Sequence, residues 1–287
     1  MLKTKPLWKC LGGKRKLAAE IIQHMPSPDA FDVYVEPFFG AGAMFFALLD
    51  AGLLEGKKLI LGDADPMVPT VLKAIQTDPT AMHKQLGEYA QAYNQGGELD
   101  RQAMYNQARI EWNTGTRDAA HCLFLRATAY NGLWRMNRSG CLNSPWGKYK
   151  RFTIPTWTQF VHLNSALQNA TIIEGDYSTC YETLDTYDRT LSYIDPPYDG
   201  GFVAYTAAGF DLEAQRNLLA QCANVQLGGG FVVYSNANTE FIADGIKEIW
   251  AGATILTITG KRSIAAAGDR RGNAPELLVI GDPSERA

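Results

Sequence analysis

Four consecutive residues, Asp195-Pro196-Pro197-Tyr198, combine groups that could hold a planar base. They follow an apolar run, so Asp195 should emerge at the carboxyl end of a strand, where open α/β sheets bind ligands. The prolines fix the backbone and leave carbonyls free to accept hydrogen bonds. An acid, a fixed carbonyl and an aromatic face suit a ring that carries an exocyclic amine. By composition alone, such a strand end is more often a plain turn.

A second feature is a strand-to-helix turn that contains Gly40 and Gly42. Without side chains there, a ligand can approach the backbone and the free N–H groups at a helix N-terminus, which suits a nucleotide-like cofactor. A dinucleotide fingerprint needs a third glycine at position 45, and Phe45 argues against hydride transfer. A merely structural turn is an equal alternative for the two glycines alone.

The next expected strand ends at Asp63, whose carboxylate is placed to accept hydrogen bonds from ribose hydroxyls. A solvated turn, or a helix cap before Pro66, is the alternative. Together with the glycine turn, Asp63 favours an adenosyl ligand.

The elements that must position these residues follow from the periodicity. Apolar runs that end in Gly, Asp or Pro alternate with helix-period segments, which predicts an α/β fold with a wound, Rossmann-like sheet. The polar pattern of residues 77–160 interrupts it, so we expect a catalytic domain of residues 1–76 and 161–287 and an inserted domain of residues 77–160. The expected strands are 33–38, 58–63, 171–176, 191–197, 230–236, 253–259 and 276–281, and the expected helices include 41–54, 66–76 and one from residue 211.

Charge is distributed unevenly although the net charge is only −3. Six basic residues and no acid lie between Lys3 and Lys16, where a solvated basic face is an equal alternative. No Asp or Glu occurs from residue 119 to 173, and aromatic residues are interleaved with the basic ones, as a phosphate-facing surface requires. The basic residues of this segment are Arg126, Arg135, Arg138, Lys148, Lys150 and Arg151.

Other classes of protein are disfavoured. Five cysteines without a CxxC pair predict neither a zinc site nor a disulfide framework, and we expect reduced thiols and a cytoplasmic setting. The amino terminus lacks the apolar stretch of a signal peptide, and no apolar run reaches the ~18 residues that span a bilayer. We expect no metal, no membrane association and no obligate protein partner.

Five segments in order resemble the successive motifs of the DNA adenine methyltransferase family, the Dam-like enzymes. The segments are GGKRKL (12–17), EPFFGAG (36–42), YNGLWRMNRSGCLNSPWGKYK (130–150), DPPY (195–198) and KRSIAAAGDRRGNAPELLVI (261–280). The resemblance implies a methyltransferase domain with an inserted helical and β-hairpin DNA-recognition domain. It further implies S-adenosylmethionine as methyl donor and N6 of adenine in double-stranded DNA as acceptor.

The resemblance also assigns roles to residues. Asp195, Pro196 and Tyr198 are the expected catalytic residues: the carboxylate and the Pro196 carbonyl hold the N6 hydrogens, and Tyr198 receives the flipped adenine without a metal or a covalent intermediate. Tyr205 and Phe210 are expected to close the site, with core packing an equal alternative for Phe210. The expected cofactor-binding residues are Cys10, Lys14, Glu36, Phe38, Gly40, Gly42, Asp63, Asp176 and Asp195. Cys10 stands where the family usually has an aromatic residue, and the nearest tryptophan is Trp8.

For DNA, the resemblance implies a hairpin over roughly residues 132–149 that enters the major groove of a GATC-like site. Arg135 would donate to a guanine, Leu133 or Pro145 would touch a thymine methyl, and Tyr130 and Asn131 would intrude beside the flipped base. The remaining expected DNA contacts are Asn137, Arg138, Lys148 and Lys150, the last three to phosphates.

Two alternatives remain open. Enzymes with related motifs methylate RNA adenine or a protein amide, although Asp195 and the basic hairpin disfavour a protein substrate. A DNA-binding protein that has lost catalysis is disfavoured because binding phosphate requires neither the DPPY segment nor the glycine turn.

Overall fold

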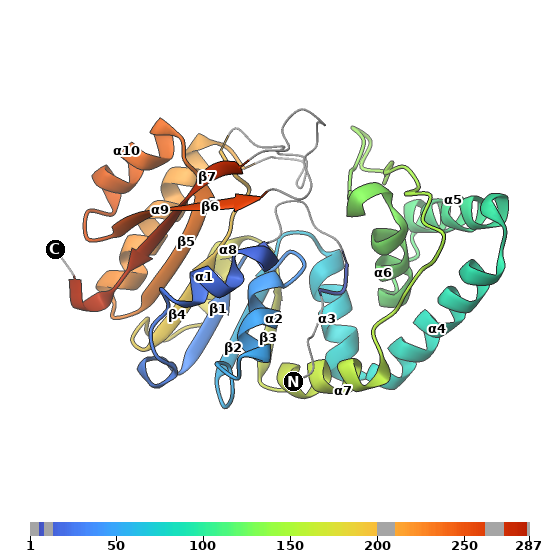
Figure 1. Ribbon diagram of the computed structural model, residues 1–287, viewed down its shortest axis with the longest axis horizontal. Helices are drawn as coiled ribbons and strands as arrows, with labels where there is room; N and C mark the ends of the chain where they lie inside the picture. The colour runs from blue at the N-terminus through green and yellow to red at the C-terminus, as the bar shows by residue number, and fades with distance from the viewer. Residues whose placement is uncertain (1–5, 9–13, 200–209, 262–272, 286–287) are drawn as a thin grey trace.

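The computed structural model describes residues 6–8, 14–199, 210–261 and 273–285, and the structural statements below concern these residues. A seven-stranded mixed sheet forms its centre (Figure 1), with the order β3-β2-β1-β4-β5-β7-β6. The strands are β1 (Val33–Glu36), β2 (Lys58–Asp63), β3 (Ala170–Glu174), β4 (Thr190–Ile194), β5 (Phe231–Ala237), β6 (Thr254–Lys261) and β7 (Asn273–Gly281). All seven predicted strands are confirmed, with small differences at their ends.

The direction of the strands determines where the site lies. Strands β1 to β5 pair in parallel, whereas β7 is antiparallel to both β5 and β6. The order reverses between β1 and β4, so the connections that leave these two strands diverge at their carboxyl ends, which is where open α/β sheets bind ligands. Because β7 runs the other way, its first residues reach that same edge.

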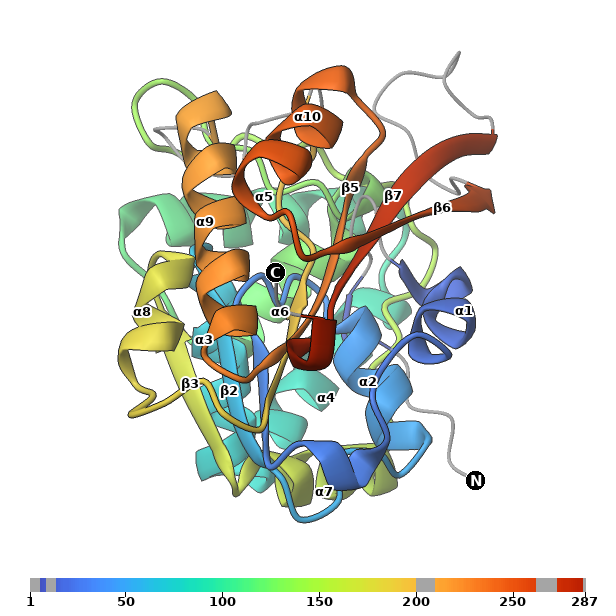
Figure 2. The same ribbon diagram turned by 90° about the vertical axis from the view of Figure 1, so that its left-hand side faces the viewer.

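Both faces of the sheet are buried, because alternate side chains of each strand enter different hydrophobic clusters. Tyr34 and Leu59 belong to one cluster, whereas their neighbours Val35 and Ile60 belong to the other. The helices also form two groups, one on each face of the sheet. Figure 2 shows α1 and α2 on one face and α8, α9 and α10 on the other. The first group is α1 (Ala18–Ile22), α2 (Ala43–Asp50) and α3 (Met67–Thr77), and the second is α8 (Tyr177–Glu182), α9 (Leu212–Leu227) and α10 (Glu240–Ile249).

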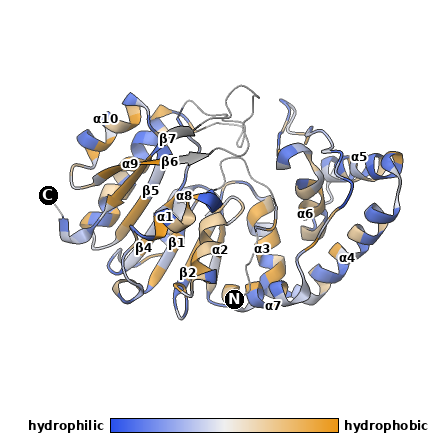
Figure 3. Ribbon diagram, in the orientation of Figure 1, coloured by the Kyte–Doolittle hydropathy of each residue, from blue (hydrophilic) through white to orange (hydrophobic). Residues whose placement is uncertain are grey.

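The insertion between α3 and β3 is mostly helical. Three of its helices begin at capping side chains: Asp78, Asp118 and Thr156 each accept a hydrogen bond from a backbone N–H of the first turn. Helices α6 and α7 pack against α3, and the outer helices α4 and α5 carry much polar surface (Figure 3). The helices are α4 (Pro79–Gln95), α5 (Glu98–Thr114), α6 (Ala119–Thr128) and α7 (Trp157–Leu167). Of the expected domain boundaries, the first falls at the end of α3 and the second inside α7.

Between α6 and α7 the chain forms an irregular hairpin rather than a regular two-stranded ladder. It begins with a 3₁₀ turn (Tyr130–Gly132), and only two isolated antiparallel bridges, Ala129 to Trp146 and Met136 to Leu142, join its arms in the described structure. Pro145 lacks an N–H, and Lys148 has a left-handed backbone (φ 54°), which a regular ladder does not accommodate. The expected β-hairpin is thus present in outline but without strands.

No helix in the described part of the chain is long and apolar enough to cross a membrane.

Candidate active site at the carboxyl edge of the sheet

The DPPY segment begins directly after β4 and is held from several sides. Lys14 donates from Nζ to Asp195 Oδ1 at 2.7 Å, and Ser235 donates from Oγ to the same oxygen at 3.0 Å. Both hydrogen bonds that Asp195 receives from described residues therefore end on Oδ1, which leaves Oδ2 available to a ligand. Behind the segment, the buried Gln215 donates to the Pro197 carbonyl at 2.8 Å, so the turn is fixed in place.

Tyr198 is fixed by its hydroxyl and by one face of its ring. The hydroxyl donates to Glu276 Oε2 at 3.0 Å and lies 3.3 Å from Ser235 Oγ. Lys14 Nζ lies 4.5 Å from the ring centroid, which is a cation–π distance. One face of the ring is thus covered by a cation, and a base that stacks on Tyr198 must use the other.

Lys14 is the cation at the centre of this group. It is only 3% exposed, and its Nζ lies 3.8 Å from Glu276 Oε2 as well as 2.7 Å from Asp195 Oδ1. Burial by itself lowers the pKa of Lys14, but Asp195, Tyr193 and Glu276 outweigh it, so the net pKa is raised. Lys14 therefore stays charged and holds two carboxylates together.

The glycine turn after β1 has the backbone that only glycine adopts easily. Gly40 and Gly42 have φ of 53° and 69°, and a Cβ at Gly42 would lie 2.5 Å from the Phe39 ring. Gly42 is the N-cap of α2, and the Gly40 N–H donates to Asp63 Oδ2 at 2.7 Å. The glycine turn and the end of β2, predicted separately, are thus joined by a hydrogen bond.

Two carboxyl groups at this edge have raised pKa values. Burial raises the pKa of Glu36 to about 8, opposed by the hydroxyl of Tyr34, which donates to its Oε2 at 2.7 Å. Burial and the neighbouring Asp65 raise the pKa of Asp63 to about 6. This edge therefore carries carboxyl groups whose ionised form is unfavourable because they are buried. A cationic ligand bound there would stabilise the ionised form.

Arg126 does not belong to the basic surface that we predicted. It is 2% exposed and donates to Asp65 Oδ2 at 2.7 Å, while its guanidinium lies 5.5 Å from the Trp134 ring. Charge alone could not reveal this, because the partner lies on a different element of the chain. The buried pair joins the end of β2 to helix α6 of the insertion, since the Asp65 N–H also donates to Asp63.

Other predicted cofactor residues lie on the loops after β1 and β3. Phe38 stacks on Tyr177 with centroids 5.6 Å apart, and Phe210 meets Phe38 edge-on at 5.7 Å. Asp176 caps α8 by accepting from the Ser178 N–H. Phe210 thus packs against the residue expected to contact the cofactor.

Two of the remaining sequence-predicted residues, Cys10 and Tyr205, lie outside the described residues. Trp8 is 5% exposed, and within the described ranges its indole nitrogen has no hydrogen-bond partner.

Hairpin side chains divide into a buried set and an exposed set. Trp134, Leu142 and Trp146 are buried, and the Ser144 carbonyl accepts from the Tyr105 hydroxyl of α5 at 2.9 Å. The insertion helices thus support the hairpin from behind. Of the predicted DNA contacts, Leu133 and Asn131 are half-buried, and the others are exposed: Tyr130, Arg135, Asn137, Arg138, Pro145, Lys148 and Lys150.

Two of these exposed residues have defined local partners. Arg135 Nε donates to Asn143 Oδ1 at 2.8 Å, and its Nη2 donates to the Asn143 carbonyl at 3.3 Å. This fixes the guanidinium while leaving other N–H donors to point outward. Asn137 Oδ1 accepts from the Ser139 and Cys141 N–H groups, so Asn137 shapes the hairpin turn.

Sequence reasoning missed Ser235 and Glu276, which contact the DPPY segment directly. Glu276 stands within the ELLVI segment that the family resemblance includes, but nothing local distinguishes it from a strand residue of β7. Its register opposite Ala237 of β5 brings it to the site.

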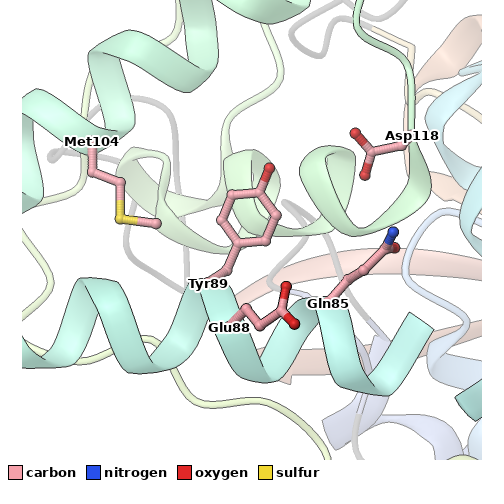
Figure 4. A pocket seen from close by; sticks show the side chains of 5 residues that line it. All are labelled: Gln85, Glu88, Tyr89, Met104 and Asp118. Atoms are coloured by element: carbon pink, nitrogen blue, oxygen red, sulfur yellow. The ribbon is translucent and has the colours of Figure 1, made fainter. Parts of the chain in front are cut away.

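A cavity of about 410 Å³ lies elsewhere, within the insertion (Figure 4). Its lining includes the carboxylates of Glu88 and Asp118, which would repel phosphate, and Asp118 also caps α6. The DNA backbone therefore does not suit this cavity. Among the described residues, no group of three or more His, Cys, Asp or Glu side chains is arranged to hold a metal.

A turn that carries a carboxylate and a glycine turn, on either side of a switch point, are typical of α/β proteins that bind ligands across the carboxyl ends of their strands. Residues 11–264 match the family described as D12 class N6 adenine-specific DNA methyltransferase. The chain belongs to this family of enzymes, and membership implies S-adenosylmethionine as the methyl donor.

Individual relatives agree with this assignment. The chain is 28% identical over 295 residues to the type II methyltransferase M.MjaIII of Methanocaldococcus jannaschii, covering 97% of this chain and 99% of the relative. It is 29% identical over 293 residues to the DNA adenine methylase of Salmonella typhi, covering 99% and 97%. Among solved structures, the rRNA methyltransferase aviRa of Streptomyces viridochromogenes has a TM-score of 0.37 and 13% identity, over 94% of this chain and 85% of that one.

Proposed function

We propose that this protein transfers a methyl group from S-adenosylmethionine to N6 of an adenine that is flipped out of duplex DNA, at a GATC-like site. The observation that carries the proposal is the geometry of Asp195. Two donors hold its Oδ1, so Oδ2 can accept from an amine next to the Tyr198 ring.

The residues at the sheet edge fit S-adenosylmethionine. Its sulfonium and ammonium groups are cationic, which suits an edge where Glu36 and Asp63 have raised pKa values. The glycine turn allows close approach to the backbone, and Asp63 retains acceptor capacity for ribose hydroxyls. When bound, the cofactor supplies an electrophilic methyl group.

The protein's contribution to the reaction is to prepare the amine. The N6 lone pair is delocalised into the adenine ring, so Asp195 Oδ2 and the Pro196 carbonyl each hold one N6 hydrogen and favour a pyramidal nitrogen. The bound cofactor would supply the methyl carbon to this nitrogen, with its sulfur keeping the electrons of the broken bond. One N6 proton then leaves to Asp195, giving N6-methyladenine and S-adenosylhomocysteine.

The base must leave the helix, because N6 cannot meet the methyl group inside a duplex. Tyr198 supports this proposal, since Lys14 covers one face of its ring and the other face can receive adenine. Tyr130 is 54% exposed, and Asn131 beside it has the left-handed backbone of a tight turn. In this proposal, both occupy the space that the base vacates.

The insertion, residues 77–160, serves as the target-recognition domain in this proposal. Its hairpin presents exposed basic residues while its buried tryptophans rest on the insertion helices. Arg135 is fixed by Asn143, so it can donate to a guanine from a defined position, while Arg138, Lys148 and Lys150 neutralise phosphates.

The test is transfer of tritiated methyl from S-adenosylmethionine to duplex DNA with and without GATC, and to RNA of the same sequence. We expect incorporation into adenine N6 of GATC-containing DNA. Asp195→Ala should reduce the rate by at least ~100-fold while retaining nonspecific DNA affinity, which comes from the basic residues. Asp244→Ala, at an exposed position on α10, is the matched control and should retain the rate.

Preferential incorporation into RNA would identify an RNA methyltransferase instead. DNA binding without any incorporation by folded protein would indicate a binding protein. A wild-type rate for Asp195→Ala would contradict its role.

A further inference from the structure

Five side chains at the sheet edge form a closed ring of contacts. Four of the contacts are those of Lys14 and Ser235 with Asp195, and of Tyr198 with Ser235 and Glu276. Lys14 Nζ and Glu276 Oε2, 3.8 Å apart, complete the ring. Its members come from the segment before α1, the turn after β4, and strands β5 and β7.

Glu276 is the member of the ring that has no assigned role. It is 6% exposed, so its contacts with the ring lie away from bulk solvent. It reaches the site because β7 is antiparallel, and its carboxylate is shared between the Tyr198 hydroxyl and the Lys14 ammonium. A single side chain thus contacts both the aromatic ring and the cation that holds Asp195.

We propose that Glu276 is a positioning residue for methyl transfer: it fixes the Tyr198 ring and the Lys14 ammonium, so that Asp195 presents Oδ2 to the adenine amine. This inference rests on the proposed function. Without Glu276, the contact that the Tyr198 hydroxyl keeps with a described residue is the longer one to Ser235, and the ring can tilt. Lys14 then loses the carboxylate that lies 3.8 Å from its Nζ.

Charge adds a second effect. Asp195 and Glu276 carry two negative charges against the single positive charge of Lys14, so the ring has a net charge of −1 when both acids are ionised. The amine becomes positively charged as it is methylated, and a net negative ring stabilises that charge. Glu276 therefore favours the transition state more than the neutral adenine.

Two variants separate orientation from charge. Glu276→Gln keeps an acceptor for the Tyr198 hydroxyl but removes the charge, whereas Glu276→Ala removes both. In single-turnover methyl transfer, we expect Glu276→Gln to be slower by about 10-fold and Glu276→Ala by about 100-fold, near the lower limit for losing a group that touches the reacting atoms. The KM for S-adenosylmethionine and the DNA affinity should change little. Glu285→Gln removes the same charge at an exposed position and should behave as wild type.

A readout without catalysis tests the positioning directly. In protein labelled with 3-fluorotyrosine and free of cofactor, ¹⁹F NMR reports on the Tyr198 ring, whose line is assigned by its loss in Tyr198→Phe. We expect this line to shift and broaden in Glu276→Ala, to move less in Glu276→Gln, and to stay in place in Glu285→Gln. An unchanged line in Glu276→Ala would overturn the proposal, whatever reaction the protein catalyses.

The two readouts also distinguish this inference from the proposed function. If the Tyr198 line moves but wild-type protein methylates no adenine, the proposed function fails while the positioning by Glu276 stands. If wild type methylates DNA and both Glu276 variants match its rate, the catalytic role of Glu276 is refuted and the proposed function stands.

Discussion

Replacing Arg126 with methionine should lower the free energy of unfolding by about 3 to 5 kcal/mol, the usual cost of breaking a buried ion pair from one side. The Arg126 and Asp65 side chains are 3% and 7% exposed, and their charged atoms are 2.7 Å apart. Methionine fills similar space, so most of the loss comes from the Asp65 carboxylate that stays buried without its cation. The contact with Trp134 adds a smaller loss.

The same reasoning predicts that the losses of stability from substitutions at Arg126 and Asp65 are not additive. Asp65→Asn should also destabilise the protein, because the buried Arg126 charge loses the Asp65 carboxylate that lies 2.7 Å from it. The double variant removes both charges, so its loss should be smaller than the sum of the single losses, by roughly 0.5 to 3 kcal/mol.

Urea unfolding measures these differences in stability. Circular dichroism and tryptophan fluorescence both monitor the unfolding, and coincident transitions in the two signals verify that it is two-state. Arg216→Met is the matched control, because it breaks a pair with Glu248 in which the two side chains are 43% and 65% exposed. Arg216→Met should lower the free energy of unfolding by only a small fraction of the amount by which Arg126→Met lowers it. Equal losses in the two variants, or simple addition in the double variant, would refute the reasoning.

Three further predictions concern the site. In methylation assays, Arg135→Ala should reduce the discrimination between GATC and altered sites by about 1 to 3 kcal/mol. Arg138→Ala should instead weaken the affinity for all DNA sequences equally. If Arg135→Ala also weakened the affinity for all sequences equally, Arg135 would be a phosphate contact. Because burial raises the pKa of Glu36 to about 8, the folded state binds more protons than the unfolded state, and stability falls as pH rises from about 4.5 to about 8. In urea unfolding between pH 6.5 and 8, Glu36→Gln should remove this fall, and an unchanged slope would contradict the assignment. Gly42→Ala should weaken the binding of S-adenosylmethionine in calorimetry and lower stability more than Gly56→Ala does. Gly56 has a similar φ of 73°, but an added Cβ there would meet open space. Equal effects of the two substitutions would mean that the steric contact at Gly42 is unimportant.

The sheet could be predicted because its determinants are local. Most strands are short apolar runs ended by Gly, Asp or Pro, and β2 begins and ends where the pattern predicts. The sequence analysis assigned no helix after β5, where α10 begins at the Thr239 cap. Its signals are local, because Thr239 caps it and the buried Ile242 and Ile246 recur at helical spacing, so this helix could have been predicted.

The contacts within the site could not be predicted, because they join residues far apart in the chain. Lys14 and Asp195 are 181 positions apart, and Arg126 and Asp65 are 61 apart. A basic residue in an acid-free segment looks solvated until its partner is known, which is why Arg126 was misplaced. The family resemblance located Asp195 and Lys14, but not the ring that joins them.

The antiparallel course of β7 has a consequence for protein synthesis. The glycine turn and the end of β2 emerge from the ribosome first, whereas Glu276 follows Asp63 by 213 residues. A nascent chain can therefore fold much of its early sheet while the ring around Lys14 is still open. If Glu276 positions the site as proposed, catalytic competence arises late in translation, and premature termination before β7 yields protein that cannot methylate.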